Sequence, residues 1–316
     1  MTTMIVETED FPGMHELEPV RAPSPLWLRP IEWLAGALFV ALVAVILTNI
    51  FTREVLSHPI AWIDEVTSLV FVWLAMLGAA LAVERSEHMR LTVFLPLFPS
   101  RLLPYIHGFA GALVLVFLGG ILRAAVEYAY EESYITSPAL EIPMSFRAAA
   151  LPVGVVLMGL MVVIHMLREL PPKAIAAGAV AAAAAVGLLY MIAPALAGLG
   201  NWNLPIYLGL LVFGCLAIGV PIAFCFGLGT LAYIAFATSR PVFVIIGRMD
   251  EGMSSLILLS VPVFVFLGCI LDATGMGKAI VNFLASLLAV PRMRGDEPDV
   301  VFATRARGAC SPHARG

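Results

Sequence analysis

Charge and cysteine are scarce in this sequence. Only 13% of its 316 residues are charged, against 61% that are hydrophobic, and the mean hydropathy is +0.97. One soluble core of this size cannot bury so much apolar surface, so the composition excludes an ordinary soluble domain and predicts an integral membrane protein. The four cysteines include no CxxC pair, which indicates neither a disulfide framework nor a zinc site.

Enzymatic motifs are also absent from the sequence. It contains no nucleophile elbow, HExxH, P-loop or GxGxxG pattern, and its six histidines have no metal-ligand spacing. A membrane-embedded enzyme would need polar catalytic groups facing one another at mid-membrane, whereas the middle of each apolar segment is almost wholly apolar. We therefore expect no catalytic residue, metal or cofactor in this chain, and no nucleic-acid partner.

Long apolar segments dominate the sequence. A helix needs about 20 apolar residues to cross the hydrocarbon core, where its backbone groups must be paired within the helix. Residues 204–237 are too long for one span and predict two short helices separated at Gly219 and Pro221. Residues 254–271, with Pro262 in the middle, and the apolar run that continues to Val290 predict a broken helix or a helical hairpin. Five segments meet the full length: residues 31–51, 66–83, 105–125, 148–167 and 174–196.

Pairs of closely spaced glycines lie within these segments. Gly108 is followed by Gly111, and Gly227 by Gly229. Small residues at such spacing let the backbones of two membrane helices approach each other closely. We expect these glycines to serve helix packing and not a ligand loop.

The distribution of basic residues predicts the orientation. Residues 1–30 form an acidic segment without the basic n-region of a signal peptide, so we expect this segment to be retained in the cytoplasm. With the N-terminus inside, seven basic residues flank the spans on the cytoplasmic side and two lie in outer loops, an excess that supports this orientation. The cytoplasmic residues are Arg21, Arg29, Arg85, Arg90, Arg101, Arg168 and Lys173, and the outer ones are Arg53 and Arg147.

Charged and aromatic residues gather at the two ends of the second predicted span. Trp62, Asp64 and Glu65 open this span and Trp73 lies within it. A second cluster follows its C-terminal end: Arg85, Glu87, His88 and Arg90. Acids at a helix N-terminus and a mixed cluster after its C-terminus complement the helix dipole, so a well-anchored span is one interpretation.

The same pattern resembles the DctQ-like small membrane subunit of tripartite ATP-independent periplasmic (TRAP) transporters. The resemblance covers about residues 30–170 and implies a four-helix scaffold domain over residues 31–170. The residues that carry it are Asp64, Glu65, Trp73, Gly78, Ala79, Ala80, Glu87, His88 and Arg90, and, in the fourth span, Pro138, Leu140, Ile142, Pro143, Pro152 and Gly154. It implies that Trp62, Asp64, Glu65, Trp73, Arg85, Glu87, His88 and Arg90 form scaffold contacts at the subunit or membrane interface.

A second resemblance begins after residue 204. Residues 219–222, "GVPI", and residues 258–268 are similar to the start of the large, DctM-like subunit of the same transporters. The resemblance implies an N-terminal part of the large permease over residues 204–290. Ser254, Ser255, Pro262 and Gly268 would belong to part of its first hairpin. The alanine-rich residues 171–203 fit neither pattern and would provide a connector span, so the chain reads as a fusion of both subunits.

The resemblance implies a role in transport. Such transporters lie in the bacterial inner membrane and import organic acids such as dicarboxylates, delivered by a periplasmic solute-binding protein and coupled to a sodium gradient. The large subunit holds the substrate and sodium sites. Because the resemblance ends near Leu288, we expect a truncated large subunit that does not move substrate alone and needs its remainder as a partner. A structural membrane anchor or assembly subunit is the alternative.

Residues 291–316 differ from the rest of the chain. Residues 291–298, "PRMRGDEP", and 310–316, "CSPHARG", resemble translations of one GC-rich CRISPR-type repeat in two reading frames. This hypothesis requires the two coding segments to be nearly identical when shifted by one base, which the nucleotide sequence tests. The alternative is an ordinary basic tail that contacts lipid headgroups.

The orientation generates the first prediction. A compartment reporter fused after Arg168 should be cytoplasmic and one fused after Asn201 should be periplasmic, because the fifth span carries the chain outward. The reverse pattern would contradict both the orientation and the connector assignment.

Overall fold

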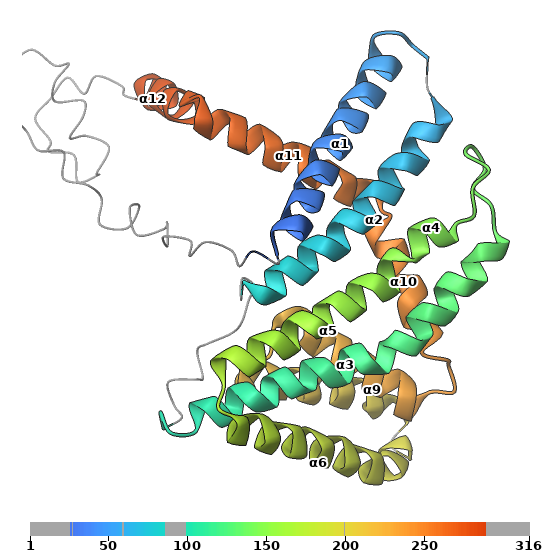
Figure 1. Cartoon of the computed structure of the whole chain (residues 1–316), viewed down its shortest axis with the longest axis vertical. Coiled ribbons are helices and arrows are strands. Elements are labelled where there is room, and N and C mark those ends of the chain that lie inside the picture. The colour runs from blue at the N-terminus through green and yellow to red at the C-terminus, as the bar shows by residue number, and fades with distance from the viewer. Residues whose placement is uncertain (1–25, 27, 59, 86–98, 199, 289–316) are drawn as a thin grey trace, which may run out of the picture. The chain divides into compact units, whose positions relative to one another are not determined.

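The computed structural model describes residues 26, 28–58, 60–85, 99–198 and 200–288 (Figure 1). Within these ranges the chain is built from helices and contains no β-strand beyond one isolated bridge between Thr136 and Pro143. The all-α fold class expected from the sequence is therefore confirmed. The chain divides into two compact units, Met1–Leu259 and Ser260–Gly316.

Among the described residues, five helices are long and apolar enough to cross a membrane, which confirms the five expected spans. Prolines open three of them, because the fixed φ of proline suits a first helical turn whose N–H groups have no intrahelical partner. The short helix α4 (Ser145–Ala148) leads into the fourth span. The five are α1 (Arg29–Glu54), α2 (Ala61–Glu84), α3 (Leu103–Glu131), α5 (Ala150–Glu169) and α6 (Pro172–Ala197).

The first four long helices pack side by side. The most extensive pairings join α2 to α5, α3 to α5 and α1 to α2, and Figure 1 shows α2, α3 and α5 as neighbouring ribbons. Ile121, Leu151 and Met161 are fully buried among them. Interleaved apolar side chains thus form the core that holds the first part of the chain together.

Helix α6 returns along α3 at a close glycine crossing. A Cβ atom added to Gly178 would come closer than 3 Å to the backbone of Gly108, and one added to Gly108 would lie 2.5 Å from the carbonyl oxygen of Ala174. The other expected glycines are also packing positions: a Cβ would lie 2.7 Å from Met166 at Gly111, 2.6 Å from Phe117 at Gly227 and 2.6 Å from Val212 at Gly229. The expectation of close helix packing is confirmed.

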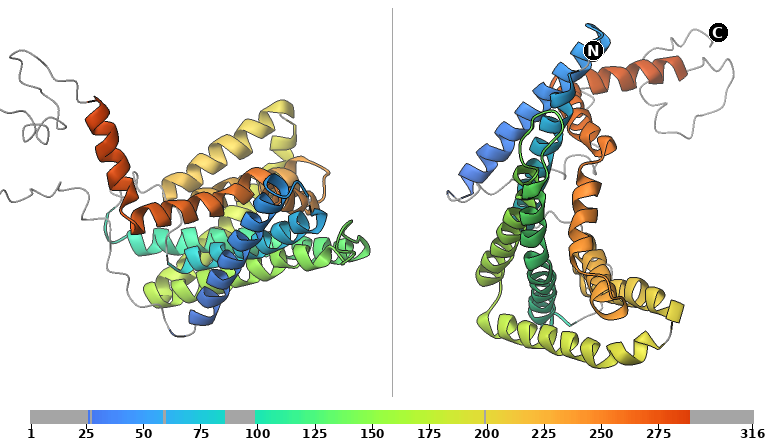
Figure 2. Two further views of the ribbon diagram at one scale, coloured as in Figure 1. Left: turned by 90° about the horizontal axis from the view of Figure 1, so that it is seen from above. Right: turned by 90° about the vertical axis from the view of Figure 1, so that its right-hand side faces the viewer.

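The next part of the chain forms the two expected short helices. Residues 203–218 run through α7 (Asn203–Pro205), a π-helical turn η4 (Ile206–Leu211) and α8 (Val212–Ile218), and α9 (Ile222–Ala237) follows. Gly219 ends α8 in the left-handed conformation, with φ 87°, and Pro221 precedes α9. This break confirms the expected separation at these residues, because glycine accepts a positive φ without steric cost. Helix α9 then packs on α3 and α6 (Figure 2).

Pro262, in the middle of the run that predicts a broken helix or a hairpin, does not interrupt a helix. Helix α10 (Phe243–Met253) ends before Ser254, and α11 (Leu256–Ala273) runs without interruption through Pro262. The breaks thus lie on either side of α11, at Ser254 and Ser255 and at Thr274 and Gly275, and the interpretation of Pro262 as the break is wrong. A helical proline removes one backbone hydrogen bond, and in an apolar segment further opening would leave more backbone groups unpaired.

The second unit contains most of α11 and the helix α12 (Met276–Leu288). Gly275, with φ 69°, lies in the turn between them. The two helices follow one another without folding back (Figure 1), so the described part of residues 254–290 has the form of a broken helix.

The glycine crossing generates the second prediction. Gly178→Ala should lower the thermal midpoint of the purified protein in detergent, because the added methyl group meets the Gly108 backbone and such overpacking costs about 1–3 kcal/mol. Gly187→Ala is the matched control, since it lies in the same helix with no atom within 4 Å of the added Cβ. Equal midpoints for the two variants would contradict the close α3–α6 crossing.

Candidate functional site

The carboxylate of Glu65 organises the loop between α3 and α4. It accepts hydrogen bonds from the backbone N–H groups of Ala139 and Leu140, both at 2.9 Å, and from the Ser137 hydroxyl. The loop closes on itself where Ser137 N–H donates to Ile142 at 2.9 Å. Charge-assisted hydrogen bonds are stronger than neutral ones, so one side chain in the first turns of α2 fixes a loop more than 70 residues away.

The other expected residues of this end join α2 to its neighbours. Asp64 accepts a hydrogen bond from Asn49 of α1 at 2.8 Å. The indole N–H of Trp73 donates to the carbonyl oxygen of Phe146 in α4 at 3.0 Å. Trp62 is about half exposed. These contacts are all made within the first four long helices and the loops between them.

The opposite end of α2 carries ion pairs. Arg85 pairs with Glu32 of α1 at 2.8 Å, and Glu84 lies 3.7 Å from Arg168 of α5. Glu87, His88 and Arg90 lie outside the described residues. The expectation that this cluster forms scaffold contacts at the subunit or membrane interface stays a prediction.

A buried polar bridge joins α10 to α3 and α4. Oδ2 of Asp250, whose side chain is only 3% exposed, accepts hydrogen bonds from the Tyr128 hydroxyl at 2.8 Å and from Nη2 of Arg147 at 2.7 Å. The ring of Tyr128 also packs against Phe243, with 5.4 Å between ring centres. A carboxylate in such a place is stable only with partners of this kind, since burial of an isolated charge is costly.

Sequence reasoning assigned no role to Asp250 and counted Arg147 only as an outer-loop charge. A signal was available in the spacing of helix α10. Ile246 is fully buried, and Asp250 follows it by one helical turn, so the acid lies on the apolar face of this helix. An acid on a buried face predicts a cationic or hydroxyl partner, although it does not say which one.

The residues after 203 share one apolar core with the first four long helices. Phe117 of α3 and Phe224 of α9 meet edge to face, with 6.1 Å between ring centres. Ile246 of α10 and Val212 of α8 belong to the same cluster of buried side chains. Helices far apart in the sequence thus bury their apolar faces against one another.

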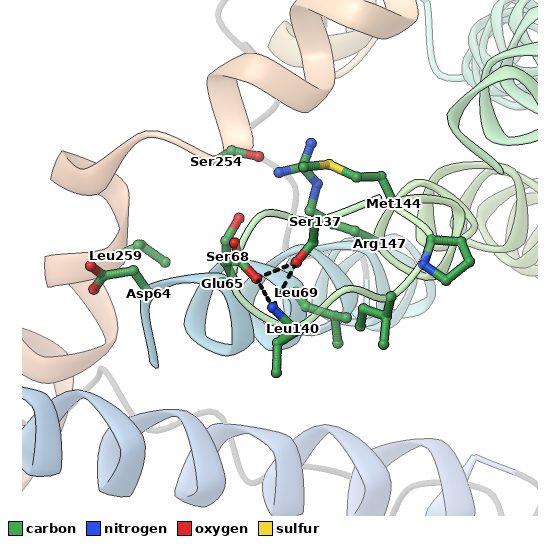
Figure 3. Close-up of a pocket in the computed structure, with 12 residues that line it drawn as sticks. Asp64, Glu65, Ser68, Leu69, Ser137, Leu140, Met144, Arg147, Ser254 and Leu259 are labelled. Atoms are coloured by element: carbon green, nitrogen blue, oxygen red, sulfur yellow. Dashed lines mark hydrogen bonds between the residues drawn. The ribbon is translucent and has the colours of Figure 1, made fainter. Parts of the chain in front are cut away.

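A cavity of about 240 Å³ lies beside the Glu65 loop (Figure 3). Ser254, one of the residues expected in the large-subunit hairpin, lines it together with Glu65 and Arg147. Ser255 lies at the break after α10, where its carbonyl oxygen accepts the N–H of Leu258 at 3.1 Å. Pro262 and Gly268 belong to the second unit. The remaining lining residues are Asp64, Ser68, Leu69, Ser137, Leu140, Ile142, Pro143, Met144 and Leu259.

A second cavity, of about 270 Å³, lies between α3, α5 and the Gly219 break. His107, His165 and Glu169 line it with Pro221 and Phe224. Among the described residues no group of three or more histidine, cysteine or acidic side chains could hold a metal ion.

Comparison with known families covers both parts of the chain. Residues 25–171 match the model of the DctQ component of tripartite ATP-independent periplasmic transporters, and residues 209–306 match that of the DctM component. The sialic acid TRAP transporter small permease protein SiaQ of Vibrio cholerae is 31% identical over 127 residues, which are 40% of this chain and 73% of that protein.

The chain belongs to the TRAP transporter permease family. It joins a DctQ region, residues 25–171, to a DctM region that begins at residue 209. The resemblance read from the sequence is thereby confirmed, and the family is one of transporters and not of enzymes. Residues 172–208, which contain α6, fall between the two matches. The DctM match continues to residue 306. It therefore does not confirm the domain boundary expected at Val290, which stays a prediction.

Fused relatives match across both regions. The sialic acid TRAP transporter permease protein SiaT of Haemophilus influenzae is 26% identical over 275 residues, 81% of this chain and 44% of that protein. The isethionate TRAP transporter permease protein DctMQ of Oleidesulfovibrio alaskensis is 25% identical over 232 residues, 72% of this chain and 35% of that protein. The chain thus spans less than half the length of these two relatives.

The Glu65 loop generates the third prediction. Glu65→Gln should speed backbone amide hydrogen exchange at Ala139 and Leu140 by about tenfold or more. The glutamine side chain has no charge and only one acceptor oxygen, whereas both backbone N–H groups still need an acceptor. The neighbouring variant Asp64→Asn is the control, since Asp64 faces Asn49 of α1. Unchanged exchange in Glu65→Gln would show that the loop holds its shape without the carboxylate.

Proposed function

We propose that this chain is a membrane component of a TRAP-type secondary transporter that imports organic acids with sodium coupling. In this proposal the DctQ region acts as the scaffold on which the DctM region is mounted. The partners are a periplasmic solute-binding protein and further large-permease spans, with the lipid bilayer around them.

One observation carries the scaffold role. The DctM helices α8, α9 and α10 bury apolar side chains in the same core as the DctQ helices, and the Asp250 bridge adds a polar link. Transport by moving one set of helices needs another set that stays in place. A four-helix region with its own tight packing and a shared core with the next region fits that second role.

The substrate class is proposed from the relatives. SiaT and SiaQ are sialic acid transporter proteins by name, and DctMQ is an isethionate transporter protein by name. Since these are acidic organic molecules, we propose an organic acid, such as a dicarboxylate, as the class of substrate for this chain.

The proposed location is the bacterial inner membrane with a cytoplasmic N-terminus. The excess of basic residues at one set of span ends supports this orientation. The Glu65 loop and the Asp250 bridge then lie toward the periplasm, the side from which a binding protein delivers substrate.

A structural membrane anchor is the alternative function. It accounts for the packing of the DctQ region equally well, but it gives no reason for the DctM region to share the core. The retention of a solute-binding protein separates the two proposals.

The fourth prediction follows from this difference. The chain in lipid nanodiscs should retain a TRAP solute-binding protein from the same organism when that protein is loaded with an organic acid, tested with sialic acid, isethionate and a C4 dicarboxylate. Empty nanodiscs are the control. Retention no greater than in empty nanodiscs for every acid would favour the anchor.

A further inference from the structure

The Asp250 bridge connects the two family regions without using the peptide chain between them. Tyr128 and Arg147 belong to the DctQ region, and Asp250 belongs to the DctM region. Both residues donate a hydrogen bond to the same oxygen, Oδ2 of Asp250. The other oxygen of Asp250 and Nε of Arg147 are buried without a hydrogen-bond partner among the described residues.

This arrangement is poorly suited to stability alone. Removing two charges from water costs several kcal/mol for each ion, and the pair regains that energy only when all its polar atoms are satisfied. Here one carboxylate oxygen and one guanidinium nitrogen have no protein partner among the described residues. Three apolar side chains of similar size in place of Tyr128, Arg147 and Asp250 would hold α3, α4 and α10 together about as well.

The same arrangement is well suited to selecting a partner. A DctM helix without an acid at this position would leave the part-buried Arg147 without its counter-ion, and a DctQ region without the arginine would leave the buried Asp250 without its own. Either mismatch costs far more than the matched pair contributes, which is how interfaces discriminate against wrong partners.

The rest of the junction resembles an interface between subunits. Helix α6 belongs with the DctQ region through its glycine crossing on α3, and the chain then passes Trp202, which is 70% exposed. Beyond it, α9 and α10 meet α3 through side chains. The peptide link near residues 198–203 is therefore not what holds the two regions together.

We propose that the Asp250 bridge is the specificity determinant of a subunit-type interface, so that the DctQ region accepts a DctM partner whose α10 carries a buried carboxylate. The two regions then stay associated when the link between them is cut. The partner that fits this surface is an apolar helix with one acid on its buried face.

Cutting the link tests this directly. A protease site inserted between Gly198 and Asn203 is cleaved in detergent, and the fraction of the DctM fragment retained on the tagged DctQ fragment is measured. The unmodified pair should stay together. Arg147→Met should weaken association by about 100-fold or more, because it leaves the buried Asp250 carboxylate without its counter-ion. Asp250→Leu should weaken it too, but less, because the Arg147 side chain that it leaves unpaired is 23% exposed.

The decisive variant removes all three polar groups together. Tyr128→Phe, Arg147→Met and Asp250→Leu in one chain should restore retention to that of the unmodified pair, since no charge is then left unpaired. Arg123→Met is the matched control: this arginine, on the same helix as Tyr128, pairs with Glu127 at 2.8 Å but is 90% exposed, so retention should not change.

Three outcomes would overturn the proposal. The fragments could separate without any substitution, the single variants could be retained as well as the control, or the triple variant could fail to restore retention of the DctM fragment. Asp250→Asn, which keeps the side-chain shape, is measured beside Asp250→Leu to exclude a packing effect and should also weaken association. The assay involves no transport and no binding protein, so its failure is distinguishable from failure of the proposed function.

Discussion

Hydrocarbon offers no hydrogen bonds to a backbone, and this constraint shapes most of the structure. Each apolar segment satisfies its N–H and C=O groups by forming a helix, including α11, which continues through Pro262. The helices are interrupted where the backbone groups at their ends can form hydrogen bonds within the turn. At Gly219 the left-handed conformation allows Val220 to donate to Cys215 at 3.1 Å, so the ends of two short helices are closed by the turn itself.

Once the helices exist, their association cannot rely on the hydrophobic effect, because lipid tails are as apolar as the side chains. Close packing and polar links take its place. The Gly108–Gly178 crossing brings α3 and α6 into backbone contact, while Glu65, Trp73 and Asp250 make polar links that cross from one element to another. Glu65 lies in the first turns of α2, whereas Trp73 and the two glycines lie within their helices.

The two family regions use both devices at their junction. Phe117 and Phe224 meet in the apolar core, and a glycine at position 227 gives Phe117 the space it occupies. Asp250 then adds a charge that only particular neighbours can accommodate. Packing keeps the regions together, and the buried charge restricts which regions can meet.

The sequence by itself determined the class, the spans and the family. Apolar length is a local property, so residues 31–51 and 174–196 predict a helix regardless of where the rest of the chain lies. Gly219 and Pro221 predict a break between helices for the same local reason. Residues such as Asp64, Glu65 and Trp73 were also visible, because charge or indole beside an apolar run stands out. Their partners were not visible. Only the tertiary structure decided that Glu65 holds residues 137–140, that helix α10 ends at Ser254 while Pro262 stays helical, and that Asp250 meets Tyr128 and Arg147. Pairing between residues more than 100 positions apart depends on which helix faces lie together, and one sequence carries no local signal of that choice.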